Sequence, residues 1–322
     1  MQILDATATA EALPWPALIA ALEATINDSQ AGRVLAPTRQ SLPLTAEAVW
    51  LIMPATSRRA DIGVCKLVSV HPENSRRGLP TIQGDIIVIR ASTGERLALL
   101  DGPAVTARRT AAITALAVRR IHRARQALSD SAVRRTPSSC LVIGCGVQGR
   151  GHLQALHAEW PGMRFYLHSR SPASAMRLAE FAGSLGIAAD VVPAPAAVLT
   201  QVDIVACCTP ALEVCLEQPP REGAIITAVG SFTPEMSEIA PDVMRQIGRN
   251  ILLDSDAARH EAGELAQAGT DPEGLPTLLS WQAQALPAIG GTVLFKSCGS
   301  SLWDLAAAEA ALSSAGQPGV SG

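Results

Sequence analysis

Cys140-Leu-Val-Ile-Gly-Cys-Gly-Val-Gln-Gly149 carries the glycine pattern from which the fold of this chain can be predicted. Its apolar first half predicts a buried strand, and we expect a helix to begin near Arg150. Between them, Gly144 allows a tight turn, Gly146 lets the backbone approach a pyrophosphate, and Gly149 lets helix and strand pack closely. The N–H groups at the helix start would face the phosphates. The segment therefore predicts a dinucleotide site; the alternative is a glycine-rich turn without a ligand.

Downstream of this segment, short apolar runs alternate with helical patterns. This alternation implies a parallel sheet with right-handed crossovers. The predicted strands cover residues 140–143, 164–168, 189–192, 203–207, 224–229 and 250–253, and a representative helix covers 172–185.

The residues before the segment follow a different order. Strand patterns dominate and predict a largely antiparallel meander, preceded by a first helix and followed by a long one. We expect the first helix over 11–30, the strands over 45–53, 61–70, 85–90 and 96–100, and the long helix over 104–128. Thr106 is a candidate cap of the long helix, and the alternative is that Pro103 lies in its first turn. After Gly291 a short strand leads into a helix over 300–312, which we expect to return to the first folding unit.

The composition restricts the class of protein. A chain of 322 residues with 48% apolar and 3% aromatic residues suits two domains with cores of Ala, Leu, Val and Ile. A net charge of -3 argues against a nucleic-acid surface. The seven cysteines lack metal-ligand spacing and fit a reducing compartment, and no apolar run reaches the ~18 residues of a membrane span. We therefore expect a cytoplasmic protein without metal, membrane or nucleic-acid partners.

The end of the second predicted strand of the parallel sheet indicates which dinucleotide binds. It reads Ser169-Arg170-Ser171 and lacks the acidic residue that would bind the ribose 2′-hydroxyl of NAD. A guanidinium suits a 2′-phosphate, so we expect NADPH to be preferred over NADH; the alternative is a solvated Arg170 and no preference. Cys208-Thr209-Pro210 and Val229-Gly230-Ser231 follow two further strands, at the edge where the nicotinamide belongs.

Several segments together resemble the ornithine cyclodeaminase/mu-crystallin family. The most specific combination is Thr106-Ala-Arg-Arg-Thr-Ala-Ala112 with the glycine turn that contains Gln148. The other segments are Gly63-Val-Cys-Lys66, Gly78-Leu-Pro-Thr81, Leu100-Asp-Gly102 and Phe295-Lys-Ser-Cys-Gly299. The resemblance runs from Arg39 to Leu305 and so covers nearly the whole chain.

The resemblance implies an α/β fold in which a Rossmann-type doubly wound parallel sheet is inserted into an α+β domain. Residues 1–115 and 295–322 would then form a substrate-binding and dimerisation domain, residues 116–294 would bind NAD(P), and the protein would be a homodimer. The implied catalytic residues are Lys66 and Arg109, and the implied substrate-binding residues are Arg39, Lys66, Arg109 and Ser297. The implied cofactor-binding residues are Thr81, Arg109, Gly144, Gly146, Val147, Gln148, Gly149, Ser169, Arg170, Thr209, Val229, Gly230 and Ser231.

One departure from the family pattern indicates the substrate. Ornithine cyclodeaminases carry Gly-Gly-Asp-Cys-Pro-Gly-Lys where this chain has Gly230-Ser-Phe-Thr-Pro-Glu-Met236. Phe232 cannot pair with the second ammonium group of an open diamine, and burying that charge unpaired is costly. A cyclic imine has no such charge. The pattern around Phe232 also resembles the bacterial Δ1-pyrroline-2-carboxylate reductases of the family.

The resemblance therefore implies NAD(P)H-dependent reduction of Δ1-pyrroline-2-carboxylate to L-proline, as in hydroxyproline catabolism, with Δ1-piperideine-2-carboxylate to L-pipecolate as a further candidate. Arg39 and Arg109 would hold the carboxylate. Lys66 would either bind the carboxylate or, with its pKa lowered by burial, donate a proton to the imine nitrogen. Read without the resemblance, Lys66 is equally a strand lysine that faces solvent.

Other charged residues are expected to have structural roles. Arg108 reads as a solvated helical charge, and His152, His157 and His168 read as structural histidines. Asp304 and Lys296 are expected to be capping or surface-pair residues, and the alternative is a functional role.

Three alternatives stay open at this point. The protein could be an ornithine cyclodeaminase, an alanine-type dehydrogenase, or a non-catalytic protein that binds NADPH and a small ligand. The ring size of an imine substrate is also open, because one methylene is worth only ~1–3 kcal/mol in an apolar pocket.

Overall fold

The computed structural model describes residues 1–130, 134–211, 213–282 and 285–314, which form two compact units. The first unit comprises Met1–Arg109 together with the chain from Ser300, and the second comprises Thr110–Gly299. The domain boundaries expected from the sequence, 115/116 and 294/295, stay a prediction. Residues 315–322 of the expected first domain lie outside the described residues.

The first unit contains a seven-stranded sheet in the order β1-β7-β6-β5-β4-β2, with β3 paired to β4. Strands β4 to β7 form the antiparallel meander predicted from the sequence. The short β1 pairs parallel to β7 and was not predicted, because three residues are too few to show an alternating pattern. The strands are β1 (Gln2–Leu4), β2 (Val34–Leu35), β3 (Gln40–Pro43), β4 (Val49–Ser57), β5 (Ile62–Val70), β6 (Ile82–Arg90) and β7 (Arg96–Asp101).

Two helix predictions for the first unit were wrong in detail. The helix expected over 11–30 is two helices, α1 (Ala6–Glu11) and α2 (Trp15–Gln30), with Pro14 at the N-cap of the second. Proline lacks the N–H group that would continue a helix through this point. The long helix α3 (Gly102–Arg125) begins earlier than expected, and the cap is Asp101 rather than Thr106: the Ala104 N–H donates to Asp101 Oδ1 at 2.7 Å.

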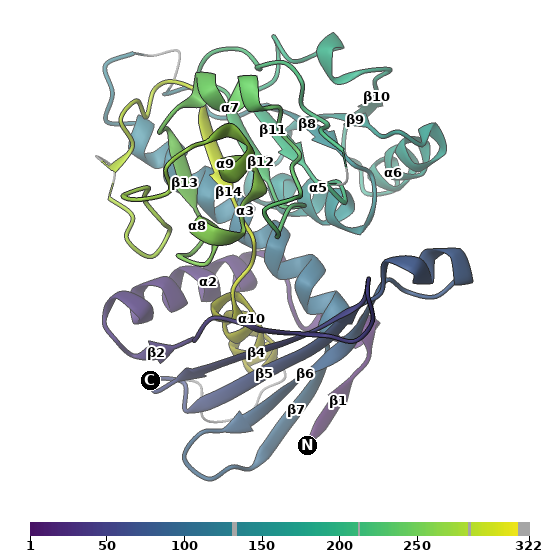
Figure 1. The fold of residues 1–322 in the computed structure, drawn as a ribbon, viewed down its shortest axis with the longest axis vertical. Coiled ribbons are helices and arrows are strands. Elements are labelled where there is room, and N and C mark those ends of the chain that lie inside the picture. The colour runs from purple at the N-terminus through teal and green to yellow at the C-terminus, as the bar shows by residue number, and fades with distance from the viewer. Residues whose placement is uncertain (131–133, 212, 283–284, 315–322) are drawn as a thin grey trace. The chain divides into compact units, whose positions relative to one another are not determined.

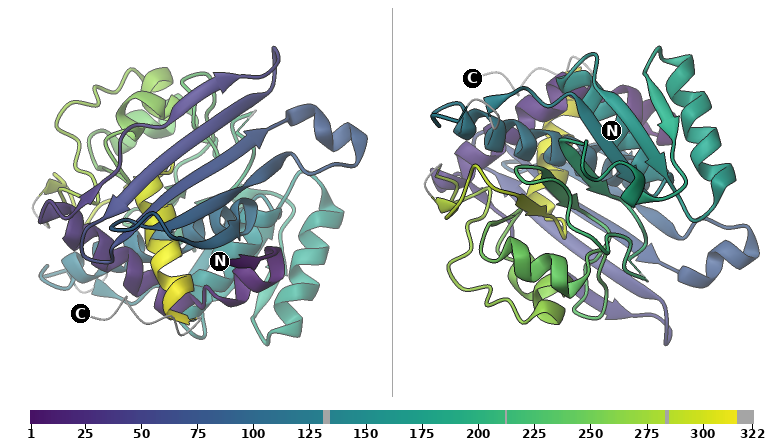
Figure 2. Two further views of the ribbon diagram at one scale, coloured as in Figure 1. Left: turned by 90° about the horizontal axis from the view of Figure 1, so that it is seen from below. Right: turned by 90° about the horizontal axis from the view of Figure 1, so that it is seen from above.

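The C-terminal helix α10 (Ser301–Ser314) returns to the first unit, as predicted. It packs against α2 and against β4 and β5, and it crosses the strands of the sheet (Figures 1 and 2). Arg59 ties these elements together, because its guanidinium lies 2.5 Å from Asp28 on α2 and 2.5 Å from Glu309 on α10. The 3-10 helix η1 (Pro72–Arg77) connects β5 and β6.

The second unit is built on a seven-stranded sheet in the order β10-β9-β8-β11-β12-β14-β13, and every pair is parallel. The predicted Rossmann-type doubly wound sheet is therefore confirmed. The strand order reverses between β8 and β11, which is the switch point where such sheets bind ligands. The strands are β8 (Ser139–Ile143), β9 (Arg164–His168), β10 (Ala189–Val191), β11 (Ile204–Cys207), β12 (Ile225–Ala228), β13 (Ile251–Leu253) and β14 (Val293–Lys296).

Helices cover both faces of this sheet. Alternate residues of β8, β11, β12 and β14 form one core with α7 (Pro241–Ile247) and α9 (Gly263–Ala268). The other face packs against α5 (Val147–Glu159), which begins three residues before the predicted Arg150. The remaining elements are η2 (Pro195–Ala197), α6 (Pro172–Ser184) and α8 (Ala258–Glu261).

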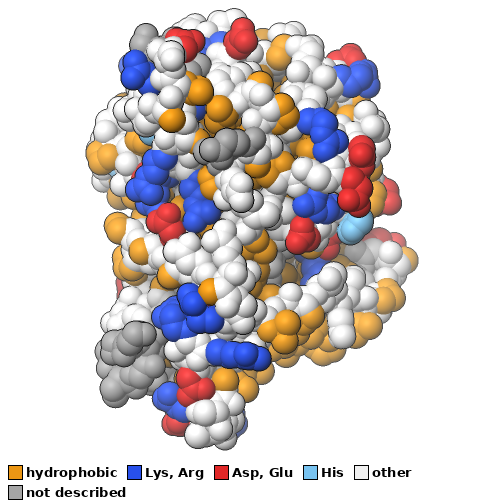
Figure 3. Space-filling view, turned by 90° about the vertical axis from the view of Figure 1, so that its left-hand side faces the viewer, with side chains coloured by type: hydrophobic (Ala, Val, Ile, Leu, Met, Phe, Trp, Pro, Cys, Tyr) orange, Lys and Arg blue, Asp and Glu red, His pale blue; other side chains and the backbone are white. Residues whose placement is uncertain are grey.

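The distribution of charged side chains on the surface is consistent with the net charge of -3. On the face shown in Figure 3, basic and acidic side chains are intermixed among apolar ones. No helix within the described ranges is long and apolar enough to cross a membrane.

Candidate functional site

The glycine turn between β8 and α5 has the geometry that a dinucleotide requires. Gly144 has a φ of +99°, and a Cβ atom there would lie 2.5 Å from the Cys208 carbonyl oxygen. A Cβ atom at Gly149 would lie 2.0 Å from the Gly144 oxygen, so helix and turn touch backbone to backbone. At Gly146, by contrast, a Cβ atom would meet nothing within 4 Å. No side chain caps α5, so its N-terminus is an open anion site that fits a pyrophosphate.

The other cofactor residues predicted for this sheet surround its switch point. Val147 and Gln148 form the first turn of α5, and Val147 is 70% exposed. Ser169 and Arg170 directly follow β9. The Arg170 guanidinium lies 2.7 Å from the Glu213 carboxylate, and both side chains are 71% exposed.

His152 is one of the three histidines that were predicted to be structural. His152 is fully buried and bonds to Thr114 Oγ1 at 3.0 Å and to the Gln148 carbonyl oxygen at 2.8 Å, so it is structural, as predicted. Its burial lowers its pKa to about 4, which keeps it neutral.

Thr209, Val229 and Gly230 follow β11 and β12, and one buried carboxylate binds all three. Glu238 accepts hydrogen bonds from the backbone N–H groups of Thr209 (2.7 Å), Val229 (3.0 Å) and Gly230 (2.7 Å), and from Thr209 Oγ1 (2.9 Å). Burial raises the pKa of Glu238, while the charge of Lys296 and the N–H groups act against this. Sequence reasoning missed Glu238, because the mixed polar and apolar loop around it gives no local signal of burial.

Ser231 continues this buried network. Its hydroxyl donates to Glu264 Oε2 at 2.5 Å, and Lys296 Nζ lies 2.9 Å from the Ser231 carbonyl oxygen and 3.3 Å from Glu264. Lys296 is fully buried, so its prediction as a surface residue was wrong. The neighbouring Ser297 is also buried and donates its hydroxyl hydrogen to Asp254 Oδ2 at 2.7 Å.

The first unit brings together the residues predicted for the substrate carboxylate. Lys66 is only 2% exposed, and its Nζ lies 3.0 and 2.8 Å from the two carboxylate oxygens of Asp304 on α10. Arg109 Nε lies 3.4 Å from the same carboxylate. Arg39 precedes β3 and is close enough to act on the charge of Lys66. The alternative of a solvent-facing Lys66 is therefore wrong.

Asp304 is fully buried, so its prediction as a cap or surface-pair residue was wrong. A single acid in the otherwise apolar start of α10 was the signal that could have found it. Burial is the main reason that the pKa of Lys66 falls from 10.5 to about 8. The charges of Arg109 and Arg39 act in the same direction, and Asp304 opposes them. Lys66 can therefore change protonation state near neutral pH.

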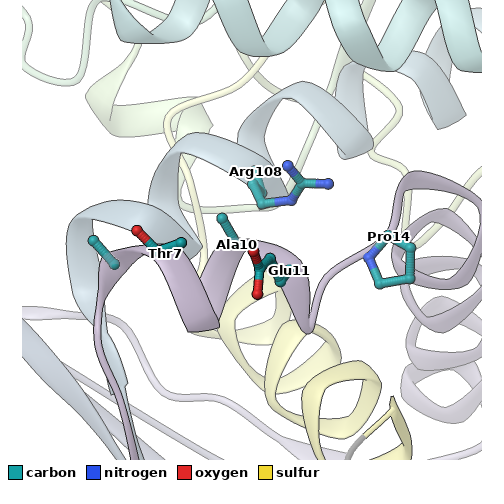
Figure 4. A pocket seen from close by; sticks show the side chains of 6 residues that line it. Thr7, Ala10, Glu11, Pro14 and Arg108 are labelled. Atoms are coloured by element: carbon teal, nitrogen blue, oxygen red, sulfur yellow. The ribbon is translucent and has the colours of Figure 1, made fainter.

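Two further predictions concern Thr81, as a cofactor residue, and Arg108, as a solvated charge. Thr81 is exposed in the loop before β6, and its carbonyl oxygen accepts a hydrogen bond from the His71 N–H group at 2.7 Å. Arg108 is partly buried rather than solvated, because its guanidinium lies 4.0 Å from the Trp15 ring and Nε donates to the Leu13 carbonyl oxygen. Arg108 borders an open pocket on α1, and none of the predicted site residues lines this pocket (Figure 4).

The glycine turn lies at the switch point of a doubly wound sheet, and a further unit carries a buried lysine and arginine. This arrangement places the chain in the class of two-unit proteins with a dinucleotide-binding fold. The chain belongs to the ornithine cyclodeaminase/mu-crystallin family, whose model matches residues 2–315. This confirms the resemblance seen in the sequence.

Within this family, the chain is similar to several proteins of named activity. The chain is 39% identical over 311 residues to Delta(1)-pyrroline-2-carboxylate reductase 1 of Burkholderia multivorans, which covers 96% of this chain and 94% of that protein. It is 38% identical over 318 residues to the Delta(1)-pyrroline-2-carboxylate/Delta(1)-piperideine-2-carboxylate reductase of Azospirillum brasilense, with the same coverage. The solved Delta(1)-pyrroline-2-carboxylate reductase of Thermococcus litoralis, in complex with NADH and L-proline, has the same fold, with a TM-score of 0.85 at 24% identity over 99% of each chain.

Proposed function

We propose that the protein is an NAD(P)H-dependent Δ1-pyrroline-2-carboxylate reductase that forms L-proline, with Δ1-piperideine-2-carboxylate as a second substrate. The observation that carries the proposal is the buried cluster of Lys66, Asp304 and Arg109. It occurs in a chain that is 37–39% identical to reductases named for this reaction. The cluster offers positive charge for a carboxylate and a titratable proton for a nitrogen, and these are the two needs of a cyclic imino acid.

The reaction adds a hydride to C2 of the ring and a proton to the imine nitrogen, and a reduced nicotinamide supplies the hydride when bound. Arg109 and Arg39 hold the substrate carboxylate through charge-assisted hydrogen bonds. Lys66 donates the proton to the imine nitrogen, because its lowered pKa makes the ammonium a proton donor near neutral pH. Asp304 orients Lys66, because its Oδ1 accepts a hydrogen bond from Nζ at 3.0 Å and its Oδ2 forms an ion pair with Nζ at 2.8 Å. Ser297 would lie at the edge of the substrate pocket, with its hydroxyl hydrogen donated to Asp254.

We further propose that NADPH is preferred over NADH. Gly144, Gly146 and Gly149 form the pyrophosphate turn, and Val147 and Gln148 begin the helix above it. Arg170 and Ser169 would bind the 2′-phosphate, and Arg170 would leave Glu213 to do so. The nicotinamide end would meet Thr209, Val229, Gly230 and Ser231. Arg109 and Thr81 are the further residues that we propose for the cofactor, from the family resemblance.

A cytoplasmic homodimer is the proposed form of the protein. One cross-strand row of the first sheet, Ile3-Leu99-Ile87-Cys65-Pro54, lies on the face opposite Lys66 and the helix α10. Ile3 is 72% exposed and Ile87 36% exposed. An apolar sheet face of this kind is typical of an interface, and a second copy would cover it. Within the described residues all seven cysteines are free, which fits a reducing compartment.

The test is the loss of NADPH absorbance when Δ1-pyrroline-2-carboxylate is added, with NADH and Δ1-piperideine-2-carboxylate run in parallel. We expect NADPH to be consumed and L-proline to form. Ammonia release from ornithine with catalytic NAD⁺ would instead identify a cyclodeaminase, and reductive amination of pyruvate an alanine-type dehydrogenase. Bound NADPH that no imine oxidises would identify a non-catalytic binding protein.

A further inference from the structure

The carboxylate of Glu238 lies where two strand-end loops of the second sheet meet. It accepts three backbone N–H groups and one hydroxyl, from the loop after β11 (Cys208–Pro210) and the loop after β12 (Val229–Ser231). Glu238 is fully buried. A carboxylate with this many donors in a water-free position forms strong, charge-assisted hydrogen bonds, so these two loops share one anchor.

The two loops approach each other closely next to the Glu238 carboxylate. A Cβ atom at Gly230 would lie 2.1 Å from the Thr209 carbonyl oxygen and 2.8 Å from the Glu238 carboxylate carbon, so only glycine lets the loops approach. The main chain of Glu238 is itself held, because its carbonyl oxygen accepts from the N–H groups of Cys215 (2.9 Å) and Leu216 (3.0 Å).

Glu264, a buried acid on α9, holds both Glu238 and Ser231 through hydrogen bonds. Glu264 accepts from the Glu238 N–H group at 3.1 Å and from the Ser231 hydroxyl at 2.5 Å. Lys296 at the end of β14 lies 3.3 Å from Glu264 and donates to the Ser231 carbonyl oxygen. The loop after β12 is therefore held at the N–H groups of Val229 and Gly230 and at Ser231. The buried Lys296 offsets one of the two carboxylate charges, those of Glu238 and Glu264.

We propose that Glu238 is a positioning residue that holds the loops after β11 and β12 in their cofactor-binding conformation before the cofactor arrives. The inference rests on the proposed function only in that these loops meet the nicotinamide end of NAD(P)H. Loops ordered in advance do not lose conformational freedom on binding, and this strengthens affinity. Without the carboxylate, the N–H groups of Thr209 and Gly230 lose their acceptor, the Val229 N–H keeps only the Cys207 carbonyl oxygen at 3.3 Å, and the loops rearrange.

The experiment compares Glu238→Gln with Glu217→Gln, an exposed glutamate of the same unit. Glutamine keeps the shape of Glu238 but turns one acceptor into a donor that faces N–H groups. NADPH is titrated into each protein and its fluorescence is followed. We expect the Kd for NADPH to rise about tenfold for Glu238→Gln, the equivalent of one lost hydrogen-bonded charge, and to stay within about twofold for Glu217→Gln. A folded Glu238→Gln protein with the Kd of the unaltered protein would overturn the proposal.

A measurement on the unaltered protein keeps the proposal testable if Glu238→Gln does not fold. Amide hydrogen exchange in the absence of cofactor should show slow exchange at Thr209, Val229 and Gly230, because their N–H groups are already bonded to a buried acceptor. Fast exchange at these three amides would overturn the proposal. Neither measurement uses imine reduction, so a wrong substrate assignment would leave both results readable. Where imine reduction is active, Glu238→Gln should raise KM for NADPH more than it lowers kcat.

Discussion

Lys66 is the residue on which the proposed chemistry depends, and its protonation sets an expected pH profile. With a pKa of about 8, the side chain is a cation below that pH and loses its proton above it. Both of its roles, proton donation and carboxylate binding, need the cation. We therefore expect kcat/KM for imine reduction to fall as pH rises through about 8. A flat profile from pH 7 to pH 10 would contradict this assignment.

Substitution of Lys66 separates its two roles. Lys66→Ala should lose nearly all imine reduction and keep NADPH binding, measured by fluorescence titration. Lys66→Arg keeps a cation but cannot release a proton in this range. It should be as inactive as Lys66→Ala if proton donation is essential, whereas substantial activity without the decline above pH 8 would mean that Lys66 only binds the carboxylate.

Substitutions of Arg170 and Glu213 should have opposite effects on the affinity for NADPH. Arg170→Ala should weaken NADPH much more than NADH, because only NADPH carries the 2′-phosphate. Glu213→Gln removes a carboxylate that lies 2.7 Å from Arg170 and would repel that phosphate, so it should strengthen NADPH selectively. The ratio of the two Kd values is the measurement. Equal changes for both cofactors would exclude the 2′-phosphate role of Arg170.

At the scale of elements, the contact between α5 and the glycine turn can be tested with two glycines. Gly149→Ala would place a methyl group 2.0 Å from a backbone oxygen. Backbone cannot move aside as a side chain does, so we expect a loss of about 1–3 kcal/mol in the free energy of unfolding, together with weaker NADPH binding. Gly183→Ala on α6 is the matched control, because a methyl group there meets nothing within 4 Å. It should stabilise the protein by about 0.5–1 kcal/mol. Urea denaturation measures both, and equal effects would contradict the packing argument.

At the scale of the whole molecule, the exposed apolar row on the first sheet makes a prediction about assembly. Light scattering should give twice the 33.5 kDa mass of the chain. Ile87→Glu places a charge in the centre of the row and should give a monomer, because a buried unpaired carboxylate opposes association. Met176→Glu, at a 52% exposed apolar residue of α6, should remain a dimer. A dimeric Ile87→Glu protein would show that another surface holds the copies together.

Local sequence patterns were enough to predict the parallel sheet, the meander, the glycine turn and the family, because periodicity and turn chemistry are properties of neighbouring residues. It placed most strand ends to within a few residues and failed where a proline or a cap changed the helix start, as at Pro14 and Asp101. Which charged side chains are buried depends on the tertiary structure and could not be predicted from the sequence. Asp304 is 238 residues from Lys66 along the chain, and Glu238 is 29 residues from Thr209. An isolated acid in a sequence looks solvated until the fold brings its donors to it, so the partners of the candidate site could not be predicted from local patterns.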